Sequence, residues 1–233
     1  MSFSILSLFP SLHIQFRLEL ADAMNPTIDE LQDANRFELI AIIPHEPVAM
    51  AAAIRKHLWN WSVPLIVYLM ANGLALLWVV WVWYQSGKNL SAGFPIFSLG
   101  IVSGYLLILP VHESLHAAAY RWMALADSVH IRYDFRYLTA ACLADRVVVS
   151  QRPFAWVCLA PSLVINPVLL GIGLILPAGI WQLLVVSALL LHIAAASGDI
   201  ALVNLLWHER ASGGLITYDD LSAGESYFFR AQV

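Results

Sequence analysis

The chain has 233 residues, of which 60% are hydrophobic and only 12% are charged, with a formal net charge of −4. An average soluble domain carries about 25% charged residues, so this composition excludes soluble, disordered and disulfide-scaffold proteins and predicts one domain embedded in a lipid bilayer. The small net charge gives no reason to expect a nucleic-acid partner, and the two cysteines, Cys142 and Cys158, are interpreted as reduced.

The first 60 residues are expected to form a cytoplasmic or interfacial region. No Lys or Arg precedes the apolar stretch at its start, which argues against a cleaved signal peptide and favours an interfacial leader. Thr27 and Glu30 fit a capping box and predict a short helix. A second helix over 48–59 follows Pro47 and is expected to continue into the first span.

Long uncharged runs predict about four transmembrane helices. The stretch from Pro153 to Gly198 contains no Asp, Glu, Lys or Arg and is too long for one span, and the turn residues at 177–179 divide it into two. The predicted spans are residues 63–84, 95–126, 154–176 and 180–207.

The distribution of basic residues predicts that both termini are cytoplasmic, because only Lys88 would then lie outside. Between the second and third spans, at 127–152, apolar and polar residues alternate over 129–137, and valines follow at 147–149. This pattern predicts a small cytoplasmic β-hairpin. The fold class is therefore mainly α, a polytopic membrane protein whose transmembrane region covers 61–208 and whose cytoplasmic tail covers 209–233.

The string His112-Glu113-Ser114-Leu115-His116 is an HExxH motif inside the second predicted span. On a helix, residues four apart share a face, so both imidazoles can bind one Zn²⁺ while Glu113 lies beside a water on the metal. An unpaired carboxylate in a span costs at least a few kcal/mol. A polar packing cluster is the alternative to a metal site.

Asp199 is the best candidate for a third ligand, because it is the only carboxylate between Pro153 and His208. Ser197 and Gly198 precede it and have little side-chain bulk, so another helix can approach closely. Glu113 and Asp199 also follow the outer starts of their spans by similar numbers of residues, so both are expected at one depth. Helix capping or an interhelical hydrogen bond is the alternative role for Asp199.

Two further polar residues lie in the predicted spans. His192 is seven residues before Asp199, about 10 Å along a regular helix, so it is predicted to pack or to hydrogen-bond a ligand rather than to bind the metal. Asn166 precedes Pro167 and is expected either to orient the substrate or its oxyanion, or to contribute to helix packing.

The chain resembles the zincin membrane peptidases, a small group related in plan to the site-2 protease family of intramembrane zinc metalloproteases. The resemblance covers about residues 94–207: HESLH on one span, a strand-rich insert, an apolar span beginning near 159–161, and Ser-Gly-Asp at 197–199. It implies that zinc is bound by His112, His116 and Asp199 and that Glu113 is the catalytic base. Site-2 proteases have Gly after the aspartate, whereas here Gly198 precedes it, and no PDZ-like domain is recognisable.

We therefore expect a multipass zinc endopeptidase of the cytoplasmic membrane that cuts a membrane-protein substrate in or near its own span. Zinc is the expected cofactor, and the lipid bilayer and the substrate are the expected partners. Two alternatives remain at this point: a non-catalytic zinc-binding membrane sensor or scaffold, and a transporter subunit, because ionisable residues in a membrane also mark ion pathways.

Overall fold

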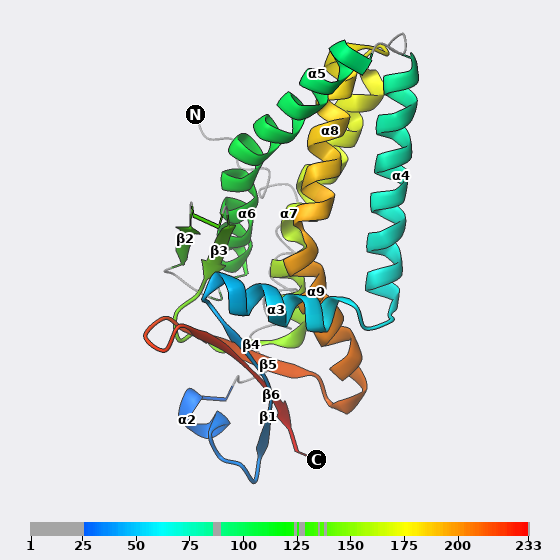
Figure 1. Cartoon of the computed structure of the whole chain (residues 1–233). Coiled ribbons are helices and arrows are strands. Elements are labelled where there is room, and N and C mark those ends of the chain that lie inside the picture. The colour runs from blue at the N-terminus through cyan, green and yellow to red at the C-terminus, as the bar shows by residue number, and fades with distance from the viewer. Residues whose placement is uncertain are drawn as a thin grey trace, which may run out of the picture.

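The structure is a computed structural model that describes residues 26–85, 90–123, 125, 129–134, 136–137 and 139–232. The predicted amino-terminal leader and Lys88 lie outside these residues. Within the described part the protein is mainly helical, as predicted, with two small antiparallel sheets (Figure 1).

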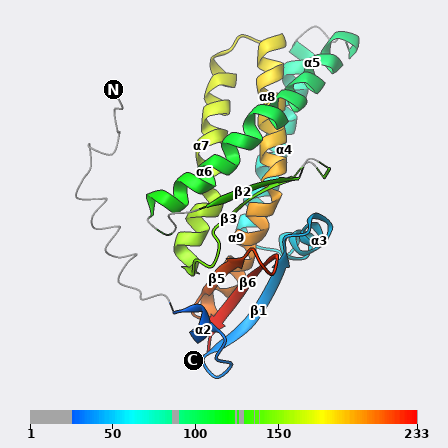
Figure 2. The ribbon, with the colours of Figure 1, turned by 90° about the vertical axis from the view of Figure 1, so that its left-hand side faces the viewer.

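The long helices stand side by side in one layer of the molecule, and the larger sheet lies beyond one end of them (Figures 1 and 2). The helices are α2 (Ile28–Leu31), α3 (Pro47–Leu58), α4 (Val63–Gln85), α5 (Leu90–Ser103), the π-helix η2 (Gly104–Ile108), α6 (Leu109–Trp122), α7 (Gln151–Ile175), α8 (Ile180–Ala195), α9 (Ser197–Glu209) and the 3-10 turn η3 (Arg210–Ser212). The strands are β1 (Phe37–Pro44), β2 (His130–Asp134), β3 (Thr139–Leu143), β4 (Val149–Ser150), β5 (Leu215–Asp220) and β6 (Glu225–Ala231).

Three helices are long and apolar enough to cross a membrane, and a fourth candidate is a bent pair. The three are Val63–Gln85, Gly93–Trp122 and Gln151–Ile175. Together, α8 and α9 make the fourth, with a bend of 41° between Ile180–Ala195 and Ser197–Ser212. These helices cover the four predicted spans, so the described residues contain three to four helices that could cross a membrane. The orientation across a membrane remains a prediction.

The bend corrects the prediction of one regular helix over 180–207. Helix α8 ends at Ala195, and α9 begins at Ser197, directly before Gly198. Serine and glycine favour a helical interior less than the leucines and alanines before them. The bend turns the residues that follow Ala196 away from the axis of α8, and Asp199 is among them.

Helix α3 does not continue into α4. The prediction that the helix over 48–59 continues into the first span is therefore wrong. The helix is interrupted at 59–62, and α3 packs against α9 near the lower end of α4 (Figure 1). Asn204 of α9 is fully buried, and its Nδ2 donates to the carbonyl oxygens of His57, Leu58 and Asn60 at 2.8, 3.1 and 2.8 Å. Because a helix leaves its last carbonyls unpaired, this side chain stabilises the end of α3.

The capping box is confirmed. Thr27 N donates to Glu30 Oε2 at 2.7 Å, and Glu30 N donates to Thr27 Oγ1 at 3.2 Å, so α2 begins where the sequence predicts. A hairpin is present between the second and third spans, as the antiparallel pair β2–β3 with His130 opposite Leu143, but its second strand is 139–143 and not the predicted valines at 147–149. It is shorter than 127–152, because Val149 pairs with Thr217 in the other sheet.

The four-stranded sheet, in the order β1-β6-β5-β4, was not predicted. Both β5 and β6 come from the segment 209–233, which was interpreted as a tail, and β1 comes from the amino-terminal region. Its inner face joins a core with α7 and α9, in which the rings of Phe154 and Phe228 meet at 5.9 Å. The segment 209–233 is therefore part of a sheet that packs against the helices, and it is not a separate tail.

Small residues bring the second and fourth spans close together. A Cβ atom added at Gly100 would lie 2.6 Å from the carbonyl oxygen of Leu184, and one at Gly104 would lie 3.2 Å from Ala188. Small residues four apart allow close helix crossing in a membrane. This crossing sets the distance between the helices that carry the candidate metal ligands.

Candidate metal centre

Three side chains predicted as metal ligands lie together. Helix α6 places His112 and His116 one turn apart, with their Nε2 atoms 3.1 Å from each other. Asp199, in the first turn of α9, places Oδ2 3.1 Å from His112 Nε2 and Oδ1 3.3 Å from His116 Nε2. One potential ligand atom from each residue lies within 4.8 Å of the others, and both histidines are buried.

These distances fit a tetrahedral zinc ion. With zinc–ligand bonds of about 2.0–2.1 Å, two ligands of a tetrahedral site are about 3.3–3.4 Å apart. The three distances in the structure, 3.1, 3.1 and 3.3 Å, are close to that value. A set of two histidines and one carboxylate also leaves a fourth position open for water or substrate, as catalytic zinc requires.

Hydrogen bonds orient the imidazole of His116 for metal binding. Its Nδ1 lies 2.8 Å from the carbonyl oxygen of Val157 in α7. A carbonyl oxygen can only accept, so the proton of the neutral ring is on Nδ1 and the lone pair is on Nε2. The lone pair of His116 therefore points toward Asp199 and His112.

A second chain of hydrogen bonds orients His112 in the same way. The oxygen Oδ1 of Asn166 lies 2.7 Å from His192 Nδ1, and His192 Nε2 lies 3.0 Å from His112 Nδ1. When His192 donates from Nδ1 to this oxygen, its Nε2 accepts the Nδ1 proton of His112. The lone pair of His112 then also lies on Nε2, beside that of His116.

The carboxylate of Asp199 completes a group of electron-rich atoms. Within the described part of the chain its Oδ2 is buried and has no hydrogen-bond partner, although His112 Nε2 is 3.1 Å away. Two imidazole lone pairs and a carboxylate repel one another at these distances unless a cation lies between them. The donor set and the orphaned oxygen therefore fit a bound metal ion.

The helix that carries the motif is irregular just before it. The π-helical turn η2 directly precedes α6, and Pro110, which has no N–H to donate to the preceding turn, follows at the start of α6. Single π-turns inside α-helices are frequent at functional sites. Ser114 Oγ donates to the carbonyl oxygen of Pro110 at 2.7 Å and so satisfies a backbone acceptor at this turn.

A cavity of about 360 Å³ contains the cluster. Glu113 is buried and lines this cavity together with His112, His116 and Asp199. The cavity continues past the hairpin strand β3 and ends at side chains from the larger sheet. Glu113 thus shares with the three candidate ligands a space large enough for part of a substrate.

The two remaining predicted site residues, His192 and Asn166, lie on the Nδ1 side of the His112 ring, away from its metal-facing Nε2. His192 contacts His112 and is not one of the three clustered ligands, in agreement with the interpretation that it hydrogen-bonds a ligand. Asn166 contacts His192, 2.7 Å away, and so reaches the centre through that ring. The structure therefore favours an orienting role for Asn166 over direct contact with a substrate.

Sequence reasoning missed the part of the cavity formed by the sheet. His45, Asp219 and Ser226 line it, although the last two belong to the segment interpreted as a cytoplasmic tail. Burial raises the pKa of the Asp219 carboxyl and lowers that of His45. Burial also raises the pKa of the Cys142 thiol, on β3, to about 12, in agreement with an unreactive cysteine. The available signal was the β-favouring Ile, Thr, Tyr and Phe residues at 216–218 and 227–229.

The structure combines three to four helices that could cross a membrane with a cluster of three side chains that could hold a metal ion. Residues 105–212 match the model of a family described as "Putative zincin peptidase". The matched region begins in η2, ends in η3 and includes all three candidate ligands and Glu113. No curated protein and no solved structure matches the chain. Over these residues the chain is similar to zinc-dependent peptidases of the zincin type.

Proposed function

We propose that this protein is a membrane-embedded zinc endopeptidase, built on the plan of the site-2 proteases, that cuts membrane proteins in or near their spans. One observation carries the proposal: His112 and His116 from one apolar helix and Asp199 from another converge on a cavity that Glu113 also lines. The family match at 105–212 supports peptidase chemistry in this region.

Each residue has a role that its position supports. His112, His116 and Asp199 would hold the zinc ion, which would supply Lewis-acid chemistry for peptide hydrolysis. Glu113 accepts the proton of the attacking water and passes it to the leaving amine. The Nδ1 partners of the two histidines keep both rings in the orientation that binding requires.

The hairpin is proposed to hold the substrate in an extended form. A helical substrate protects its carbonyl groups by hydrogen bonding, so it must unwind before hydrolysis. Strand β3 lines the cavity, and in the described part of the chain it pairs along one edge only, with β2. An extended segment can add to such an open edge through main-chain hydrogen bonds, which would place its carbonyl groups beside Glu113.

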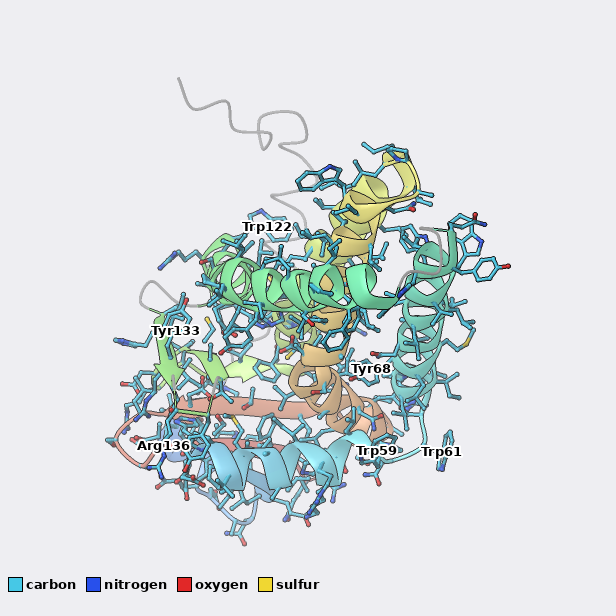
Figure 3. The ribbon with its side chains drawn as sticks, turned by 45° about the horizontal axis from the view of Figure 1, so that its top comes forward. Trp59, Trp61, Tyr68, Trp122, Tyr133 and Arg136 are labelled. Carbon is cyan, nitrogen blue, oxygen red and sulfur yellow. The ribbon has the colours of Figure 1, made fainter. Side chains whose placement is uncertain are left out.

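The protein is proposed to lie in the cytoplasmic membrane with both termini inside. The exposed side chains Trp59, Trp61 and Trp122 lie next to the span ends that face the sheet and hairpin, and they support a membrane–water boundary at those ends (Figure 3). Tryptophan is enriched at the membrane–water interface. The same ends carry most of the basic residues.

The experiment that tests the function compares Glu113→Gln with the wild type. This substitution leaves the three ligands in place, so we expect unchanged zinc content and a loss of peptidase activity of about 10²-fold or more. In a host that expresses either form, the membrane proteome should accumulate an uncut protein with the variant. Equal processing by the two forms would contradict the enzyme and favour a zinc-binding sensor.

A further inference from the structure

The cavity that holds the candidate metal centre has a second polar end. Asp219 of β5, Ser226 of β6 and His45, which follows β1, line it on the side of the sheet. Between the two ends the wall contains apolar side chains such as Phe154, Val157 and Phe228. An extended segment that passes the metal centre would therefore reach a polar group beyond an apolar stretch.

The carboxylate at this end forms no ion pair with Lys or Arg among the residues that the structure describes. Asp219 is only 8% exposed, and it accepts hydrogen bonds from Ser226 Oγ at 2.6 Å and from Ala144 N at 3.0 Å. In the described part of the chain no Lys or Arg forms an ion pair with it, whereas its neighbour Asp220 has Arg146 at 3.5 Å. A carboxylate has about four acceptor positions, so Asp219 can accept further hydrogen bonds from an occupant of the cavity.

His45 does not supply the missing charge. Ser226 gives its only proton to Asp219, so it must accept from His45 Nε2, which lies 3.0 Å away. The Nδ1 atom of His45 is buried and has no hydrogen-bond partner among the described residues, so it is a second bare acceptor at the same end. Burial lowers the pKa of His45, in agreement with a neutral ring.

The charge at the metal end is balanced when the site is loaded. A divalent ion there offsets the two carboxylates of Asp199 and Glu113, which leaves Asp219 as the uncompensated carboxylate that lines the cavity. A buried unpaired charge is costly. The chemistry at the sheet end therefore fits an occupant that brings both a positive charge and several hydrogen-bond donors.

We infer that the sheet end of the cavity, formed by Asp219, Ser226 and His45, is a subsite for a Lys or Arg side chain of the substrate. This inference rests on the proposed function and adds the class of substrate to it. Membrane proteins carry Lys and Arg just beyond the cytoplasmic ends of their spans, and the sheet lies on the predicted cytoplasmic side. The basic residue would lie a few residues to the cytoplasmic side of the bond that is cut.

The test measures binding without requiring cleavage. The probe is a synthetic fluorescent peptide with a span of about 20 Leu and Ala residues, followed by a Ser/Gly segment in which one position at a time is Lys, norleucine or Glu. Its affinity for the zinc-loaded Glu113→Gln protein is measured in nanodiscs. At one position or more we expect the Lys peptide to bind about 10- to 100-fold more tightly than the norleucine peptide and the Glu peptide to bind least tightly.

Substitutions assign this preference to the subsite. Asp219→Asn should reduce the ratio of Lys to norleucine affinity to near one without weakening norleucine binding, and Asp219→Glu should keep the preference. Asp220→Asn, at the neighbouring position outside the cavity, is the matched control and should behave as the parent protein.

Two outcomes would overturn the inference. The first is equal binding of the Lys, norleucine and Glu peptides, which is measured without any variant of Asp219. The second is a preference for the Lys peptide that survives in Asp219→Asn. Cleavage of the same peptides by the protein with Glu113 intact is read separately. A charge preference without cleavage would remove the proposed function and keep the cation subsite.

Discussion

The hydrogen-bond chain behind His112 makes a quantitative prediction about zinc affinity. In His192→Ala, His112 Nδ1 loses its partner at 3.0 Å, and Asn166 Oδ1 loses its partner at 2.7 Å. The ring of His112 is then free to rotate and to place its proton on Nε2, where it would block metal binding. All three ligands remain present, so binding should weaken but persist.

The magnitude follows from what is removed. Loss of a partner behind a metal-ligating histidine typically lowers metal affinity by about 10- to 100-fold, which corresponds to about 1.4–2.7 kcal/mol. His192→Gln should recover part of this loss, because its Oε1 can accept the Nδ1 proton of His112. His116→Ala removes a ligand and should abolish tight binding altogether.

The assay is a competition for zinc between the purified protein in detergent and a chromophoric chelator, with helix content monitored by circular dichroism. His208→Ala is the control, because that histidine is on α9 but exposed. An unchanged zinc affinity in His192→Ala would refute the proposed orientation of His112. A loss as complete as that of His116→Ala would instead show that His192 is itself a ligand.

Three further substitutions test the site and its support. Asp199→Asn should weaken zinc binding and abolish cleavage, because a neutral amide is a poor replacement for an anionic ligand, whereas Asp220→Asn should leave both unchanged in assays of metal content and proteolysis. Glu113→Gln should keep stoichiometric zinc and lose activity, measured on the same sample. Gly100→Leu should lower both thermal stability and zinc affinity, since its Cβ would lie 2.6 Å from a carbonyl oxygen of α8, while Gly73→Leu, with nothing within 4 Å, should not.

The helices could be predicted because their signal lies within one continuous stretch of sequence. The metal cluster could be predicted because few other residues were available as ligands. An apolar run that is long enough to cross a bilayer as a helix indicates a span, whatever segments pack against it. The motif at 112–116 places two ligands on one helix face by spacing alone. Asp199 could be proposed because almost no other carboxylate was available at that depth, and the structure places its oxygens 3.1 and 3.3 Å from the two histidines.

The four-stranded sheet could not be predicted because its partners are distant in sequence. Phe37 pairs with Ala231, and Val149 pairs with Thr217, so three separate segments must meet before any strand is stabilised. Each segment alone is short and only partly alternating. The polar subsite was missed for the same reason, since His45, Asp219 and Ser226 come together only when β1, β5 and β6 pair.

The bend at Ala196 shows how a local break in one helix changes the geometry that helical spacing predicts for the metal centre. On a regular helix, His192 and Asp199 would point along one face about 10 Å apart, and His192 was for that reason assigned a role behind the ligands. In the structure the helix bends by 41° between them, and both residues still contact His112, one at Nδ1 and the other at Nε2. The ring of His112 thus lies between a neutral partner on α8 and an anionic one on α9. A substitution that straightens the helix at Ser197–Gly198 should therefore separate Asp199 from His112 while leaving the contact with His192 intact.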